Sequence, residues 1–211
     1  MDCKLAGMRN FFVPTFLFLF LLSTLSFVEK DSPHRGNETY TYAELISVYE
    51  RLDAEHEEAK LLVAGAADVG KPIHLFVIDK GRHFNPEGAG EQGKTIVLIN
   101  NGIHPGEACG IDASVELAKN LLNPKHELHA SLDSLVILIV PVYNVGGMLN
   151  RGSYSRASQN GPLEHGFRGN AKNLDLNRDF IKCDSKNAKT FAALLHFWDP
   201  DIFVDTHTTN G

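Results

Sequence analysis

Residues 95–101 read T-I-V-L-I-N-N, and residues 135–142 read L-V-I-L-I-V-P-V. Both stretches are almost continuously apolar, which is typical of strands buried on both faces of a parallel sheet. The chain between them contains a predicted helix at residues 108–122, which ends before Pro124. Because buried strands alternate with a helix here, the sequence predicts an α/β sandwich with a mixed, largely parallel central sheet.

The same alternation continues on both sides of this segment. Thr41 and Glu44 form a predicted capping box at the start of a helix that ends near Lys60. The other predicted elements are a strand at 73–79, a glycine-rich loop at 81–93, a helix at 188–198 and a strand at 202–205. Residues 143–186 contain many Gly, Asn and Ser residues with little periodicity, and a loop of this length inside a compact domain is typically functional.

The first 28 residues have the pattern of a secretory signal. Lys4 and Arg9 give a positive start, an apolar run follows at residues 11–22, and small residues precede a predicted cleavage after Ser26. The apolar run is short for a membrane span, and an uncleaved anchor is the alternative. We therefore expect a signal at residues 1–28, followed by a polar linker at 29–40. The protein would be secreted, extracellular or periplasmic, without stable membrane association after cleavage.

Charge and cysteine content exclude two kinds of site. The chain carries 20 Lys and Arg residues against 26 Asp and Glu residues, a formal net charge of −6. Phosphate binding needs a basic surface, so we expect no nucleic acid partner. Cys3 lies in the predicted signal and no C-x-x-C motif is present, which excludes a cysteine-rich zinc site. Cys109 and Cys183 could pair in an exported protein, and the sequence leaves this open.

The first candidate site follows the strand at residues 95–101, where the chain reads N-G-I-H-P-G-E. In open α/β sheets, ligands bind at the carboxyl ends of the strands. His104 and Glu107 stand three residues apart at this position, and Pro105 and Gly106 fit a tight turn that aims both side chains at one point. Imidazole nitrogen and carboxylate oxygen both suit Zn²⁺. Taken alone, the motif also fits a helix start with an exposed histidine.

A second histidine follows the last predicted strand, residues 202–205. His207 would complete a set of two histidines and one glutamate, which leaves a fourth zinc position open for water. Taken alone, His207 equally fits a surface or core histidine. Asp205 either supports the strand or orients His207, and the sequence does not separate these roles.

The third candidate lies in the irregular segment, at residues 168–180. Arg168, Asn177 and Arg178 could build an anion pocket, because the planar guanidinium group binds carboxylates through two hydrogen bonds. The alternative is a solvated loop with ordinary surface ion pairs.

Together these segments resemble the zinc carboxypeptidase family, which includes carboxypeptidases A, B and D. The first family motif, H-x-x-E, is His104 and Glu107, and an N-x-D-L-N-R-N-F-like segment is found at residues 173–180. A lone histidine closing a strand is the third motif, and His207 follows Glu107 by 100 residues. Arg168 stands nine residues before Asn177, where the shorter, carboxypeptidase D-like members place an arginine. The resemblance covers residues 41–211.

The resemblance implies a zinc metallocarboxypeptidase that acts on the C-terminus of a peptide or protein through metal-activated water. His104, Glu107 and His207 would hold one Zn²⁺ ion, and Arg168 would polarise the scissile carbonyl and stabilise the oxyanion. Asn177 and Arg178 would bind the terminal carboxylate of the substrate. Asp179 replaces the asparagine that is more usual at its position.

The resemblance also implies that the catalytic domain at residues 41–211 is truncated. The general-base glutamate and the substrate-capping tyrosine of the family lie well downstream of the third ligand, and this sequence ends four residues after His207. We therefore expect an incomplete sheet, and the sequence leaves open whether the chain alone is active, because none of its residues can be assigned either role. Two other functions stay open: a zinc amidohydrolase of the aspartoacylase or succinylglutamate desuccinylase type, and a non-catalytic metal-binding remnant.

Overall fold

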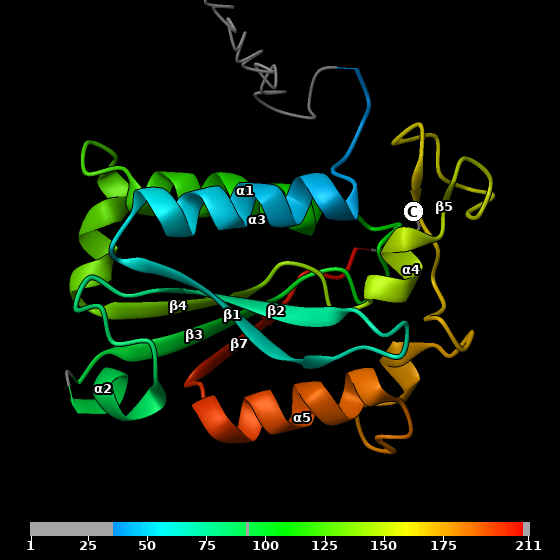
Figure 1. Cartoon of the computed structure of the whole chain (residues 1–211). Coiled ribbons are helices and arrows are strands. Elements are labelled where there is room, and N and C mark those ends of the chain that lie inside the picture. The colour runs from blue at the N-terminus through cyan, green and yellow to red at the C-terminus, as the bar shows by residue number, and fades with distance from the viewer. Residues whose placement is uncertain (1–35, 92, 209–211) are drawn as a thin grey trace, which may run out of the picture. The chain divides into compact units, whose positions relative to one another are not determined.

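A computed structural model describes residues 36–91 and 93–208. Helices and strands alternate along most of this chain (Figure 1). In order, the regular elements are α1 (Tyr42–Glu55), β1 (Ala59–Ala66), β2 (Pro72–Ile78), α2 (Pro86–Glu91), β3 (Thr95–Asn100), α3 (Cys109–Leu122), the 3₁₀ helix η1 (Glu127–Asp133), β4 (Leu135–Val140), α4 (Val145–Leu149), β5 (Arg151–Gly152), β6 (His165–Gly166), the 3₁₀ helix η2 (Leu176–Arg178), α5 (Lys186–Trp198) and β7 (Ile202–Asp205).

Five strands form one mixed sheet in the order β1-β2-β4-β3-β7. Strand β2 is antiparallel to both of its neighbours, whereas β3 is parallel to β4 and to β7. Four of the five strands therefore point the same way. Helices α1 and α3 cover one face of the sheet and α5 covers the other (Figure 1). The predicted α/β sandwich with a mixed, largely parallel sheet is confirmed.

The two apolar stretches that predict this fold are neighbours in the sheet. Strands β3 and β4 pair in parallel, with Leu98 opposite Leu138 and Ile99 opposite Ile139. Three of these four side chains are fully buried, and Ile99 is almost so. Because burying one such side chain contributes about 1.5–3 kcal/mol, the β3–β4 pair is the centre of the core. It also fixes the direction in which the chain leaves β3 toward His104.

Helix α1 begins as predicted and ends earlier. The Thr41 side chain accepts a hydrogen bond from the Glu44 backbone, and the Glu44 carboxylate accepts one from the Thr41 backbone at 2.9 Å. The helix stops at Glu55 instead of continuing to about Lys60, because β1 begins at Ala59 and pairs with β2. Pairing with a neighbouring strand overrides the local preference there.

Two further element boundaries differ from the prediction. Helix α2 forms inside the expected glycine-rich loop at residues 81–93. Helix α5 starts at Lys186, before the expected residue 188, because the Ser185 hydroxyl accepts a hydrogen bond from the Ala188 backbone at 2.9 Å and caps the first turn.

The predicted signal at residues 1–28 and the linker as far as residue 35 lie outside the described residues. In the remainder of the expected linker, Gly36 and Asn37 are exposed, whereas Thr39 and Tyr40 are buried and their carbonyl groups accept hydrogen bonds from Arg151. The last two residues of the expected linker therefore pack against the helices and strands that follow. No helix among the described residues is long and apolar enough to span a membrane. Cys109 and Cys183 are both free thiols, so the pairing left open above does not occur in this structure.

Candidate metal centre

The carboxyl ends of β3 and β7 bring the two candidate histidines together. The two strands pair in parallel up to Asn100 and Asp205, so the chain segments that follow them leave the sheet side by side. The rings of His104 and His207 meet edge to face, with centroids 4.9 Å apart. One ligand atom each from His104, Glu107 and His207 lies within 4.8 Å of the others. The structure thus assembles the predicted cluster from residues a hundred positions apart.

Two observations show that this cluster fits a zinc ion. Nδ1 of His104 lies 3.2 Å from Oε1 of Glu107, and two ligands at zinc bonding distance in a tetrahedral site are about 3.3 Å apart. Nε2 of His207 is buried and has no hydrogen-bond partner among residues 36–91 and 93–208. An unpaired buried polar atom is costly unless something binds it, and a metal ion would do so. The predicted set of two histidines and one glutamate is therefore chemically suited to Zn²⁺.

Each histidine ring is held by an aspartate. Nε2 of His104 lies 2.9 Å from Oδ1 of Asp175, and Nδ1 of His207 contacts the Asp205 carboxylate. A ring whose proton faces an aspartate keeps the lone pair of its other nitrogen for a metal. Of the two roles left open for Asp205, the structure supports orientation of His207. Asp175 lies inside the D-L-N-R segment, but the sequence assigned it no role.

Asp175 also holds Arg168 beside the cluster. Its Oδ2 accepts hydrogen bonds from Nε and Nη2 of Arg168 at 3.1 and 3.0 Å. Burial alone would raise the pKa of Asp175, but hydrogen bonds from His104, the Asn177 backbone and Arg168 outweigh it and hold the pKa below its ordinary value. The guanidinium Nη1 lies 3.4 Å from Nδ1 of His104. A fixed cation therefore lies next to the candidate metal position.

Asn177 and Arg178 stand on η2, directly after Asp175. Arg178 is exposed, and its Nη1 donates to the Asn177 carbonyl at 3.0 Å. Within residues 36–91 and 93–208, no hydrogen bond or ion pair links either side chain to the three candidate ligands. Their role in binding a substrate carboxylate stays a prediction.

The tight turn predicted at Pro105 and Gly106 is confirmed, because the Glu107 backbone donates a hydrogen bond to the His104 carbonyl at 2.9 Å across it. The left-handed residue of this segment is Gly102, with φ of 64°, whereas Gly106 is required for close packing. A Cβ atom at Gly106 would lie 2.6 Å from Cδ of Arg156 and 2.9 Å from the Gly166 carbonyl oxygen. Oε1 of Glu107 accepts a hydrogen bond from Nη2 of Arg156 at 3.1 Å. Arg156 therefore contacts the cluster, and nothing in its sequence context indicated this.

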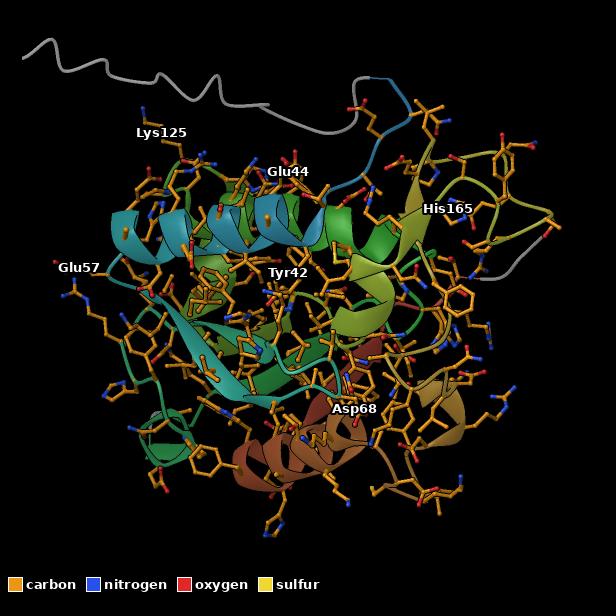
Figure 2. All side chains as sticks on the ribbon, turned by 45° about the vertical axis from the view of Figure 1, so that its right-hand side comes forward. Tyr42, Glu44, Glu57, Asp68, Lys125 and His165 are labelled. Carbon is orange, nitrogen blue, oxygen red and sulfur yellow. The ribbon has the colours of Figure 1, made fainter. Side chains whose placement is uncertain are left out.

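Two buried asparagines support the site without belonging to any predicted group. The Asn144 amide donates to the carbonyls of Ile103 and Arg168, and so joins the turn after β3 to the arginine. The Asn170 amide donates to Asp68 at 3.0 Å, beside the amino-terminal end of α5 (Figure 2). Asn and Asp residues are common in loops, so only the fold reveals which of them are buried and bonded.

Asp179 is explained by the turn that follows it. Its carboxylate is buried and accepts hydrogen bonds from the Asp184 and Ser185 backbones, both at 2.9 Å. Burial would raise the pKa of Asp179, but hydrogen bonds from Ser185 and Asp184 outweigh it and lower the pKa. A carboxylate in place of the expected asparagine therefore closes the turn that leads into α5.

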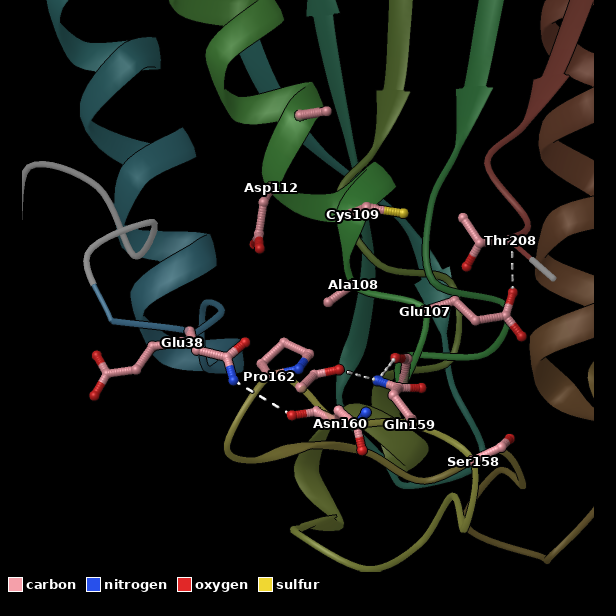
Figure 3. A pocket seen from close by; sticks show the side chains of 14 residues that line it. Glu38, Glu107, Ala108, Cys109, Asp112, Ser158, Gln159, Asn160, Pro162 and Thr208 are labelled. Carbon is pink, nitrogen blue, oxygen red and sulfur yellow. Dashed lines mark hydrogen bonds between the residues drawn. The ribbon is translucent and has the colours of Figure 1, made fainter. Parts of the chain in front are cut away.

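An open cavity of about 860 Å³ adjoins the cluster on the α3 side. Glu107 and Thr208 line one edge, where the Thr208 backbone donates to Oε2 of Glu107 at 2.9 Å (Figure 3). Gln159 and Asn160 also line the cavity. The glutamate thus faces open space as well as its two histidine neighbours.

Solved structures share this fold. A metallo-carboxypeptidase from Burkholderia cenocepacia superposes with a TM-score of 0.63 and 20% identity, over 82% of this chain and 42% of that chain. A metallo-carboxypeptidase from Pseudomonas aeruginosa, in complex with (2-guanidinoethylmercapto)succinic acid, gives 0.61 and 20%, over 82% and 40%. Carboxypeptidase A from Helicoverpa armigera gives 0.60 and 15%, over 80% and 46%. The chain thus spans less than half the length of these proteins.

A search of curated proteins found no significant match. The family model for zinc carboxypeptidases matches residues 45–207, a range that contains β1 to β7 and all three candidate ligands. The predicted resemblance is confirmed at the level of the family. The chain therefore belongs to the zinc carboxypeptidase family.

Proposed function

We propose that this protein is a zinc-dependent metallocarboxypeptidase that hydrolyses the C-terminal peptide bond of peptides or proteins. The convergence of His104, Glu107 and His207 carries the proposal, because their ligand atoms lie within 4.8 Å of one another at the carboxyl ends of two strands. Family membership supports peptide hydrolysis as the chemistry. The chain spans less than half the length of the solved carboxypeptidases above.

Zinc bound at this cluster would act as a Lewis acid and lower the pKa of a water molecule. The residues of the chain would then divide the remaining work. Arg168 lies beside the cluster and is held there by Asp175, so it would stabilise the negative charge that develops on the carbonyl oxygen. Because a fixed cation needs no reorganisation during the reaction, the Asp175 anchor supports this role.

Asn177 and Arg178 would bind the terminal carboxylate and so restrict cleavage to chain ends. Arg178 is exposed and its side chain makes one hydrogen bond, to the Asn177 carbonyl, within the described part of the chain. Its guanidinium group can therefore take a carboxylate with little loss of existing contacts. Hydrogen bonds to charged groups contribute about 1.5–3 kcal/mol, which is enough to discriminate a free C-terminus from an amide.

The test compares matched peptides with a free or an amidated C-terminus. We expect release of the last residue from the free peptide only. Arg178→Ala should raise KM about 10- to 100-fold and leave the zinc content unchanged. An unchanged KM would remove Arg178 from the carboxylate-binding role. Cleavage of an N-acyl amino acid without any cleavage of peptides would overturn the proposal in favour of the amidohydrolase function.

We also propose that the protein is exported and acts outside the cytoplasm. The pattern of residues 1–28 supports this. Mass spectrometry of the N-terminus of protein recovered from the medium or periplasm should find cleavage after Ser26. A protein that retains Met1 and stays with the membrane fraction would instead favour the uncleaved anchor.

A further inference from the structure

We propose that Arg156 is a positioning residue that fixes the metal ligand Glu107 in its binding orientation. This inference rests on the proposed function, because it assumes that Glu107 binds the metal. Arg156 comes from the irregular segment between β5 and β6, which no motif of the sequence singles out. That segment would then help to form the metal site.

The first observation is a buried ion pair. Nη2 of Arg156 lies 3.1 Å from Oε1 of Glu107, with only 8% and 5% of the two side chains exposed. Charges this deeply buried are costly unless they are paired in good geometry. Among the described residues, the Arg156 side chain forms no other hydrogen bond or ion pair. The pair is therefore specific to the metal ligand.

The second observation is that the same segment grips the turn between the two ligands. Cδ of Arg156 occupies the space where a side chain at Gly106 would begin, only 2.6 Å from an ideal Cβ position. The Gln159 amide donates to the carbonyls of Gly106 and Gly161 at 2.8 and 2.7 Å (Figure 3). The segment thus binds both the backbone of the turn and the carboxylate of Glu107.

The third observation is that Glu107 needs such support. It lines the open cavity next to the cluster, so protein atoms do not enclose it completely on that side. The Thr208 backbone donates a hydrogen bond to Oε2 and therefore holds only that oxygen of the carboxylate. Without Arg156, Oε1 would lose its only cationic partner among the described residues, and the carboxylate could turn toward the cavity.

Two effects of Arg156 on the metal oppose each other. Its positive charge repels a divalent cation, which by itself would weaken zinc binding. Holding the ligand in place strengthens binding, and loss of a residue that orients a metal ligand typically costs 10- to 100-fold in affinity. If a variant without the positive charge binds zinc more weakly, positioning outweighs repulsion; if it binds zinc more tightly, repulsion outweighs positioning.

The experiment measures zinc affinity by competition with a chelator in the wild type, Arg156→Met and Arg156→Lys. We expect Arg156→Met to bind zinc about 10- to 100-fold more weakly, with partial recovery in Arg156→Lys. Unchanged or tighter zinc binding by folded Arg156→Met would overturn the proposal. If Arg156→Met does not fold, Gln159→Leu serves instead: about 2- to 10-fold weaker binding is expected, and wild-type affinity would contradict the positioning role.

Two controls separate positioning from general stability and from the metal site itself. Arg151→Met removes a neighbouring arginine that bonds only backbone carbonyls of Tyr40, Thr39 and Glu164 in the described structure. It should lower the unfolding temperature and leave zinc affinity and the visible spectrum of bound Co²⁺ unchanged. Arg156→Met should alter that spectrum, and an unaltered one would count against positioning.

If Glu107→Gln binds zinc like the wild type, the proposed metal site is wrong; if only Glu107→Gln loses zinc, the Arg156 proposal is wrong.

Discussion

The end of the sheet that carries the candidate metal ligands and the segment at residues 167–185 reach the same site by different physical means. At the end of the sheet, parallel pairing of β3 and β7 fixes where His104 and His207 leave the sheet. In the segment, three residues of 3₁₀ helix are the only regular structure, and buried polar side chains fix the path. Backbone ladders thus position the ligands, and side-chain hydrogen bonds position the arginine beside them.

This difference has consequences for how each region tolerates change. A strand end is supported by many backbone bonds and apolar contacts, so one surface substitution changes little. The segment depends on a few amides and carboxylates, and a buried donor that loses its partner costs about 1–3 kcal/mol. In the segment, we therefore expect single substitutions of buried polar residues to lower stability. At the end of the sheet, we expect large effects only for the candidate ligands and for residues at points of close packing.

The largest effect is expected for His104→Ala. Two remaining ligands hold zinc poorly, so the affinity should fall by more than about 100-fold, beyond the loss seen for residues that only orient a ligand. The measurement is zinc content after dialysis against a chelator. His196→Ala, an exposed histidine on α5, is the matched control and should keep the wild-type content. Undiminished zinc in folded His104→Ala would break the assignment of the sheet end as the metal site.

Next comes Asn170→Leu in the segment. Oδ1 of Asn170 accepts hydrogen bonds from the Lys172 and Leu174 backbones, both at 2.9 Å, and its amide donates to buried Asp68. Leaving these groups unpaired should cost about 2–4 kcal/mol in the free energy of unfolding, measured by denaturant titration. Lys182→Met in the same segment removes an exposed ion pair with Asp184 and should cost much less. Equal costs would refute the dependence on buried amides.

A smaller effect is expected for Gly110→Ala at the start of α3. A Cβ atom there would lie 2.2 Å from Oγ1 and 2.3 Å from Cβ of Thr206, the residue before His207. Overpacking of this kind costs about 1–3 kcal/mol, and it should also weaken zinc binding by displacing His207. Gly152→Ala, where nothing lies within 4 Å of the added atom, should be neutral in both assays. If Gly110→Ala leaves stability and zinc affinity intact, the close approach of α3 does not position His207.

The smallest effect is expected for Asp179→Asn, and it should depend on pH. The folded-state pKa of Asp179 lies below its ordinary value of about 3.9, so its contribution to stability is complete above about pH 4 and is lost as the pH falls through the folded pKa. The variant should be less stable by about 1 kcal/mol at pH 7. Unfolding measured from pH 7 down to pH 3 should show the gap closing, whereas a constant gap would rule out the ionised carboxylate as the cause.

The sequence predicts the sheet end well for a physical reason. Continuous apolar runs mark β3 and β4, and the rule that ligands lie at the carboxyl ends of strands then selects His104, Glu107 and His207. Strand β1 is not recognised, because it lies at the edge of the described sheet with a partly exposed pattern and takes its conformation from pairing with β2. Periodicity reports burial, so it finds central strands before edge strands.

The support of the site is much less predictable. Asn144 joins carbonyls that lie 41 and 24 residues away from it in the chain, and Arg156 bonds a carboxylate 49 residues before it. Such bonds form only after the fold has brought these segments together, and the residue types involved are ordinary in loops. A sequence motif indicates which residues are candidates for the chemistry, whereas the residues that position them can be identified only from the folded structure.

Anomalous scattering at the zinc absorption edge from crystals grown with the metal would test the central claim most directly. We predict one strong peak bonded to a ring nitrogen of His104, a ring nitrogen of His207 and the carboxylate of Glu107, with distances of about 2.0–2.2 Å. A peak bonded to other side chains, or no peak while the two rings remain together, would contradict the assignment of these three residues as a zinc site.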